Sequence, residues 1–157
     1  MTVTASVEID APPERVWETL LAFDHYPDWN PLIRRIEGRP AVGRTIRAII
    51  DQPMAPPLPL HATVTRFDPE RELAWETNIP SAGLLTVTHR FRLRPIASGE
   101  RTEFTQVEEL DGSLGRAVPD RLIGFLADGF VEMNEALVRR VESRQDVSDD
   151  GCHDHNR

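Results

Sequence analysis

The chain has 157 residues, the size of one ordinary domain, and its 39% hydrophobic and 28% charged residues are a balance typical of globular proteins. Its net charge is −8 and its 18 basic residues are all scattered arginines, so we expect no nucleic-acid partner, and its single cysteine excludes an internal disulfide. No apolar run approaches the roughly 20 residues of a membrane-spanning helix and no signal-peptide pattern opens the chain, so we expect a cytoplasmic protein without stable membrane insertion.

The N-terminal residues alternate between apolar and polar side chains. This alternation, from Val3 to Ile9, predicts a half-buried strand over residues 2–10. The prolines and acids of residues 10–14 then indicate the start of a helix, because proline is tolerated in the first helical turn. Two further prolines limit residues 24–30 to a second short helix.

From residue 32 onward the period-two alternation returns, with turn signals at short intervals. The predicted strands cover residues 33–37, 44–51, 61–67, 72–79, 84–94 and 102–110. Short turns between consecutive strands predict an antiparallel sheet. Residues 52–60 contain four prolines, which predicts a stiff connecting loop, because proline cannot occupy a central strand.

A long helix is predicted from Pro119 to residue 142 or 143. Apolar residues recur there every three or four positions, from Leu122 to Val141. Residues 145–157 are acidic and aperiodic, which predicts a disordered tail after a domain of residues 1–144. Metal-capable side chains at positions 152–155 lie in that tail, which cannot position ligands, so no metal site and no cofactor are predicted.

This order of elements predicts an α+β fold, in which a curved antiparallel sheet of about seven strands wraps around a long C-terminal helix, with two short helices after the first strand. Three motifs carry a resemblance to a known family: IDAPPERVW at residues 9–17, YPDWNP at 26–31 and FDPEREL at 67–73. The chain resembles the START-like (SRPBCC, Bet v 1-like) superfamily of helix-grip proteins, in its polyketide cyclase/dehydrase and lipid-transport branch. The resemblance implies a deep apolar cavity between sheet and helix, and it brings no catalytic motif with it.

Strand parity predicts which residues face that cavity. Odd positions of 84–94 and even positions of 102–110 are the more apolar, so they share one inner face. The connecting turns favour Trp75 opposite His89, His89 opposite Gln106 and Phe91 opposite Phe104. The residues predicted to bind a ligand are Trp29, Met54, Val64, Trp75, Thr77, Val87, Phe91, Phe104, Gln106, Phe125, Gly129 and Met133. Gly129 lacks a side chain on the inward stripe, which favours a cavity of about 300–1,000 Å³.

The inner face is apolar except around His89, Gln106 and Glu108. The predicted register places His89 and Glu108 on a diagonal, about 7–8 Å apart at the backbone, which their side chains can span. Such a pair could serve as catalytic acid and base on a carbonyl compound, as cyclisation and dehydration require. In the alternative interpretation the two side chains bond to each other or to water and stabilise the core.

Three functions therefore stand as hypotheses. The first is binding of a small hydrophobic molecule, such as a lipid, a polyketide or an aromatic metabolite, in the internal cavity. The second is a polyketide cyclase or dehydratase that uses His89 and Glu108. The third is a co-chaperone or antitoxin-like module, which would need an exposed apolar patch. A polar cluster that faces a ligand with free hydrogen-bonding capacity would favour catalysis, and a self-satisfied cluster would favour binding.

Overall fold

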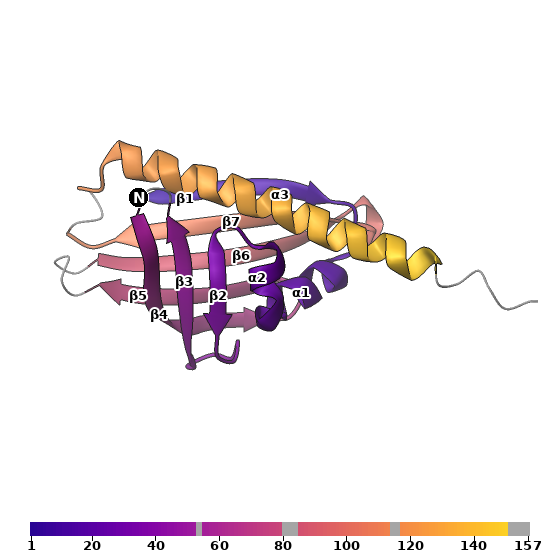
Figure 1. Ribbon diagram of the computed structural model, residues 1–157, viewed down its shortest axis with the longest axis horizontal. Coiled ribbons are helices and arrows are strands. Elements are labelled where there is room, and N and C mark those ends of the chain that lie inside the picture. Colours follow the sequence, from indigo (N-terminus) through magenta and orange to yellow (C-terminus); the bar gives the residue numbers. More distant parts are fainter. Residues whose placement is uncertain (53–54, 80–84, 114–116, 151–157) are drawn as a thin grey trace, which may run out of the picture.

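Within residues 1–52, 55–79, 85–113 and 117–150, which the computed structural model describes, the chain forms one seven-stranded antiparallel sheet with helices packed against it (Figure 1). The strands are β1 (Thr2–Ile9), β2 (Ile33–Glu37), β3 (Thr45–Gln52), β4 (Ala55–Asp68), β5 (Glu72–Ile79), β6 (Leu85–Ile96) and β7 (Arg101–Asp111). The helices are α1 (Pro13–Leu21), the 3₁₀ turn η1 (Phe23–His25), α2 (Tyr26–Trp29), the 3₁₀ turn η3 (Ala97–Gly99) and α3 (Asp120–Asp150).

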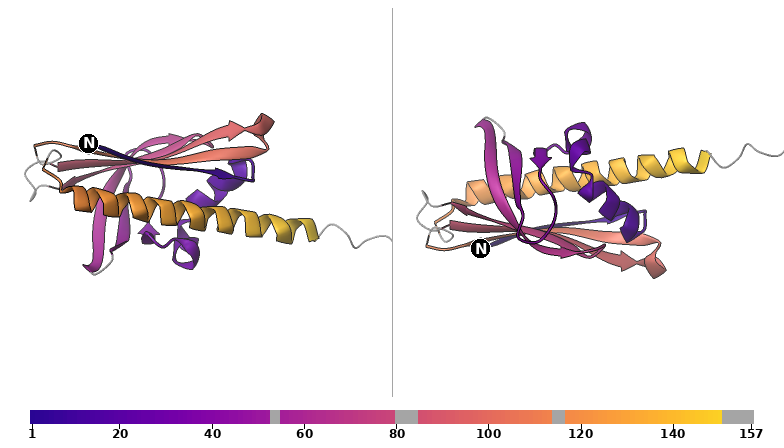
Figure 2. Two further views of the ribbon diagram at one scale, coloured as in Figure 1. Left: turned by 90° about the horizontal axis from the view of Figure 1, so that it is seen from above. Right: turned by 90° about the horizontal axis from the view of Figure 1, so that it is seen from below.

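The sheet has the strand order β1-β7-β6-β5-β4-β3-β2 and is strongly curved. In Figure 1, β2 and β3 run across the direction of β6 and β7, and Figure 2 shows α3 lying along the concave side of the sheet. The short helices α1 and α2 close one end of this half-barrel. The predicted α+β helix-grip fold, with its two short helices after the first strand, is therefore confirmed.

The predicted proline-rich loop at residues 52–60 is wrong, because β4 begins at Ala55 and carries three of the four prolines. Among the described residues, β4 pairs with β3 from Ala55 onward but with β5 only from Thr63 onward. Along an open strand side no neighbour requires a backbone N–H donor, so proline is tolerated there. The exposed prolines of this stretch agree with such an edge position.

Helix α3 is longer than predicted and is buried over a shorter stretch. It continues to Asp150 instead of ending at residue 142 or 143, because no proline or glycine interrupts residues 143–150, so the backbone of residues 145–150 is helical rather than disordered. Leu122, predicted on the buried stripe, is 46% exposed. The fully buried stripe begins only at Phe130 and continues through Met133, Leu137 and Val141.

The core lies between the concave face of the sheet, α3 and the corner formed by α1 and α2. Helix α1 contributes Trp17, whose ring packs edge-on against Phe67 at 5.4 Å. Tyr26 is fully buried, and its hydroxyl donates to the carbonyl of Leu20 at 2.7 Å. Burial raises the pKa of Tyr26 above its ordinary value. The Tyr26–Leu20 hydrogen bond connects α2 to the end of α1.

Candidate functional site

The inner face of β5, β6 and β7 carries the polar residues that the sequence singled out. The predicted pairing of Trp75 with His89 is confirmed, but the predicted pairing between β6 and β7 is displaced by two residues. His89 lies directly opposite Glu108, rather than opposite Gln106. The displacement arises because residues 97–100 all belong to the connection, so pairing starts with Ile96 and Arg101. A shift of two leaves every side chain on its predicted face.

His89 and Glu108 form a direct pair in the interior. His89 Nδ1 lies 3.1 Å from Glu108 Oε2, and the two side chains are only 8% and 12% exposed. A ring that donates its Nδ1–H to a carboxylate presents Nε2 as a hydrogen-bond acceptor. The interpretation in which the two side chains bond to each other is therefore confirmed for one nitrogen of the ring.

Three aromatic rings enclose the imidazole of His89. Trp75 stacks on it at a centroid distance of 5.4 Å and 16° between planes. Phe91 meets it edge-on at 4.8 Å, and Phe130 of α3 does so at 5.3 Å. The Nε2 atom is buried and has no hydrogen-bond partner in the part of the chain that the structure describes. Because a buried polar atom without a partner costs free energy, this nitrogen is an unusual feature of the core.

A second polar group links the sheet to α3. Gln106 is fully buried, and its Nε2 donates to the carbonyl of Phe130 at 3.3 Å and to Asn134 Oδ1 at 2.6 Å. Within the described ranges Gln106 Oε1 and Asn134 Nδ2 are buried and unpaired. The polar cluster of His89, Glu108, Gln106 and Asn134 thus keeps free hydrogen-bonding capacity at three atoms.

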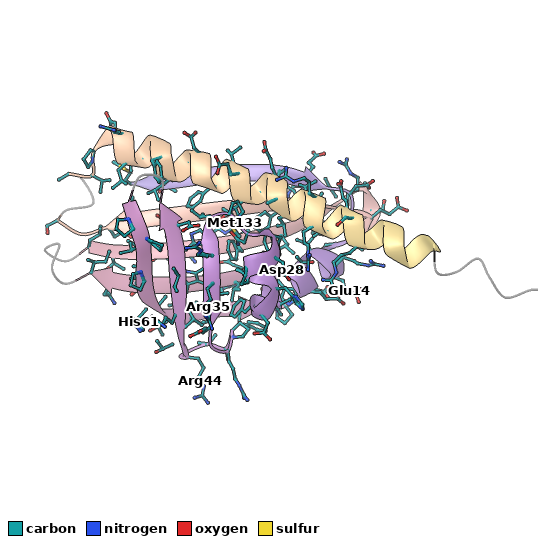
Figure 3. The ribbon with its side chains drawn as sticks, viewed as in Figure 1. Glu14, Asp28, Arg35, Arg44, His61 and Met133 are labelled. Carbon is teal, nitrogen blue, oxygen red and sulfur yellow. The ribbon has the colours of Figure 1, made fainter. Side chains whose placement is uncertain are left out.

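Most other predicted ligand-binding residues lie on the same inner face. Val64 is opposite Trp75, and Thr77 is opposite Val87. Phe104 packs against Phe91 at a centroid distance of 5.7 Å. The buried members of this set are Val64, Trp75, Thr77, Phe91, Phe104, Gln106 and Met133, whereas Val87 is half-buried. Figure 3 shows Met133 between α3 and the sheet.

Phe125 and Gly129 lie apart from this cluster, in a groove beside α3. The groove has a volume of about 440 Å³ and is lined by Pro31, Leu32, Asp51, Phe125, Asp128, Gly129 and Glu132. A Cβ atom at Gly129 would lie 3.1 Å from Leu32 Cδ1, so glycine serves close packing here rather than opening space. His89 is not among the lining residues of this groove.

Two predicted positions remain outside the cluster. Trp29 is half-buried and packs edge-on against Tyr26 at 5.3 Å, and its buried Nε1 has no partner among the described residues. The neighbouring Asn30 side chain accepts from the backbone N–H groups of Leu32 and Ile33, which shapes the entry into β2. Met54 lies outside the described residues.

The sequence did not single out Asn134. Phe130 was read as a core residue that could also contact a ligand, but it was not among the predicted ligand-binding residues. Both lie on the buried face of α3, one helical turn apart. A polar residue beside Met133 on an otherwise apolar stripe was the available signal, because buried polar side chains need partners. No group of three His, Cys, Asp or Glu side chains in the described ranges is placed to hold a metal ion. The helices of those ranges include none that is long and apolar enough to cross a membrane.

Comparisons with known proteins agree with the architecture. The family model described as "Polyketide cyclase / dehydrase and lipid transport" matches residues 1–142. The Zhui aromatase/cyclase from Streptomyces sp. R1128 superimposes with a TM-score of 0.72 at 20% identity, covering 92% of this chain and 94% of that one. A START superfamily protein from Mycobacterium smegmatis gives a TM-score of 0.68 at 19% identity, covering 90% and 97%.

A further solved structure, protein MLL2253 from Mesorhizobium loti, gives a TM-score of 0.69 at 22% identity and covers 92% of this chain and 98% of that chain. No curated protein sequence matches the chain. At these identities the structural likeness shows the fold alone.

Proposed function

Because the chain belongs to the polyketide cyclase/dehydrase and lipid-transport family, we propose that it binds a small, mostly apolar molecule between the sheet and α3, with a polar group of that molecule bonded to His89. The observation that carries this proposal is the unpaired, buried Nε2 of His89 inside three aromatic rings. A ligand hydroxyl would satisfy this nitrogen, and the rings would pack against the apolar part of the ligand.

The fixed orientation of His89 supports a specific contact over general hydrophobic binding. Glu108 selects the tautomer in which Nδ1 donates and Nε2 accepts. Stacking on Trp75 holds the ring in place, so a ligand bond to Nε2 requires no reordering of the side chain. An internal ligand space around this atom is part of the proposal.

A cyclase or dehydratase is the second candidate, and both the pairing of His89 with Glu108 and the unpaired Nε2 of His89 favour it. A histidine oriented by a carboxylate is a common arrangement of a general base. Nε2 would take a proton from a carbon next to a carbonyl group, leaving an enolate, and would return that proton to the departing oxygen as water is lost. The protein-binding hypothesis has no comparable observation in its favour among the described residues.

Equilibrium dialysis with 2-naphthol tests the binding proposal. We expect 2-naphthol to bind more tightly than 2-methylnaphthalene, which has the same rings but no donor. His89→Phe keeps a ring in the aromatic enclosure and should weaken 2-naphthol binding about threefold to tenfold, the range for one lost hydrogen bond, without affecting 2-methylnaphthalene. His61→Phe is the matched control, because His61 is exposed on β4 and points away from α3 (Figure 3).

Glu108→Gln distinguishes binding from catalysis, and it is the alternative test variant if His89→Phe does not fold. The glutamine oxygen still accepts from Nδ1, so the tautomer and 2-naphthol binding should be retained, while a base that needs the carboxylate charge would lose turnover. Equal binding of 2-naphthol and 2-methylnaphthalene, or an equal loss in His61→Phe, would contradict the proposal.

A further inference from the structure

The amide pair of Gln106 and Asn134 is not explained by a ligand bond to His89 alone. The two residues are 0% and 2% exposed and come from β7 and α3, so their side chains join the two layers that enclose the interior. Their orientation is determined by the Phe130 carbonyl, which can only accept and therefore faces Gln106 Nε2. Asn134 Oδ1 accepts from the same nitrogen at 2.6 Å.

This orientation leaves one acceptor and one donor unused. Gln106 Oε1 and Asn134 Nδ2 are buried without a partner in residues 1–52, 55–79, 85–113 and 117–150. Two amides can form two hydrogen bonds with each other, and here only one is formed. A group that completes this pair must donate to Gln106 Oε1 and accept from Asn134 Nδ2. A hydroxyl or a primary carboxamide can do both, whereas an ionised carboxylate can only accept.

The amide pair lies within reach of a ligand bonded to His89. Glu108 is directly opposite His89, and Gln106 is two residues along the same strand on the same face. His89 and Gln106 are therefore diagonal neighbours, about 7–8 Å apart at the backbone. Phe130 contacts both positions, since its ring meets His89 and its carbonyl accepts from Gln106. One or two fused rings span such a separation.

Charge in this interior also discriminates between ligands. The carboxylate of Glu108 is already nearly buried beside His89. A ligand carboxylate at the amide pair would face the acceptor Oε1 of Gln106 and add a second negative charge to the same apolar surroundings, which is unfavourable.

We infer that Gln106 and Asn134 are specificity-determining residues, which recognise a neutral group that both donates and accepts a hydrogen bond. This inference rests on the proposed ligand bond to His89. The chain accordingly selects neutral ring compounds that carry a hydroxyl at one end and a hydroxyl or carboxamide at the other, and it discriminates against free carboxylic acids.

Four related probes test this selectivity by equilibrium dialysis: 2-naphthol, 2,6-dihydroxynaphthalene, 6-hydroxy-2-naphthamide and 6-hydroxy-2-naphthoate. At least one of the two neutral bifunctional probes should bind about tenfold more tightly than 2-naphthol, since it adds two neutral hydrogen bonds. The naphthoate should bind more weakly than 2-naphthol. Asn134→Leu should abolish the tenfold gain of the bifunctional probes over 2-naphthol.

Asn78→Leu is the matched control, because Asn78 is exposed on β5 and its side chain accepts from Thr86 on the outer face. It should retain the full preference, and Asn134→Ser replaces Asn134→Leu if the leucine variant does not fold. If 2-naphthol itself does not bind, the proposed function is wrong. If 2-naphthol binds but the added group brings no gain, or if the gain survives in Asn134→Leu, only the role of the amide pair is refuted.

Discussion

The two faces of β6 and β7 carry two polar arrays of opposite character. On the outer face Arg90 donates to Glu72 at 3.1 Å and to Glu109 at 3.2 Å, and these side chains are partly exposed. On the inner face His89, the preceding residue, is nearly buried and uses one of its two nitrogens. Adjacent positions of one strand thus differ in burial, although Arg90 Nε, like His89 Nε2, is buried without a partner among the described residues. Water reaches the exposed parts of the outer array and screens its charges, whereas only a buried group can complete the inner array.

The outer array shows what ion pairing does to the pKa values of its members. Burial acts to lower the pKa of Arg90, but its hydrogen bonds with Glu72 and Glu109 outweigh burial and raise that pKa. Arg94 likewise donates two bonds to Glu103, at 3.1 and 2.9 Å, which lower the pKa of that carboxyl. Such pairs favour the charged forms on the surface but contribute little to stability, because solvent screens them.

The largest expected effect is that of His89→Ala. The substitution leaves Glu108 buried without its partner and removes a ring that packs against three aromatic side chains, so the free energy of unfolding should fall by about 3–5 kcal/mol. Urea denaturation measures this change. The control His61→Ala, at an exposed position, should stay within about 0.5 kcal/mol. A loss of 1 kcal/mol or less (about the effect expected on the outer face) would show that the two arrays do not differ.

Glu72→Gln tests the outer array at its most connected carboxylate. Glu72 lies within 4 Å of Arg66, Arg90 and Arg92, and the arginines are 26–56% exposed at their side chains. We expect urea denaturation to show a loss of about 1 kcal/mol, decreasing further at high salt, because these charges are screened. Glu100→Gln, at an exposed turn position, should change stability by less. A loss as large as that of His89→Ala would contradict the comparison.

The pH dependence of the outer face should follow Glu103. Because Arg94 lowers the pKa of Glu103 in the folded state, the stabilisation from this pair is present above the unfolded-state pKa and is lost as the pH falls through the folded-state pKa. NMR titration of the Glu103 carboxyl should therefore give a pKa below its ordinary value. In Arg94→Gln the pKa should return to that value, and an unchanged titration would show that Arg94 is not the cause.

The smallest effect is expected from removing residues 145–157, which we propose are dispensable. They are polar and acidic, and the last turns of α3 extend past the end of the sheet (Figure 1). A chain that ends at Arg144 should melt within about one or two degrees of the full-length protein, since such segments bury little apolar surface. A larger decrease in thermal stability would show that this segment packs against the domain.

Local sequence patterns determined which strand residues face inward and where the first helices form. Strand alternation predicted the inner face of β6 and β7 correctly, because side-chain direction along a regular strand alternates, and a register shift of two residues preserves that alternation. The motif at residues 9–17 and the proline-limited helix after it were likewise readable, since proline and capping act within one or two turns. For the same reason His89, Gln106 and Glu108 could be assigned to one surface before their contacts were known.

The contacts themselves depended on the tertiary structure. The residues used by the η3 connection decide whether His89 lies directly opposite Glu108 or diagonal to it. The alternation of apolar and polar residues in β6 and β7 is the same in both registers. The prolines of β4 led to the wrong prediction of a loop. Proline is tolerated where a strand has no hydrogen-bonded neighbour, and the neighbours of a strand cannot be read from its own sequence. Asn134 is part of the polar cluster because it accepts a hydrogen bond from Gln106, which is 28 residues away in the sequence. The two residues meet only when the sheet curves around α3. Hydrogen bonds between distant segments require the chain to be placed in three dimensions, and local periodicity contains no information on that placement.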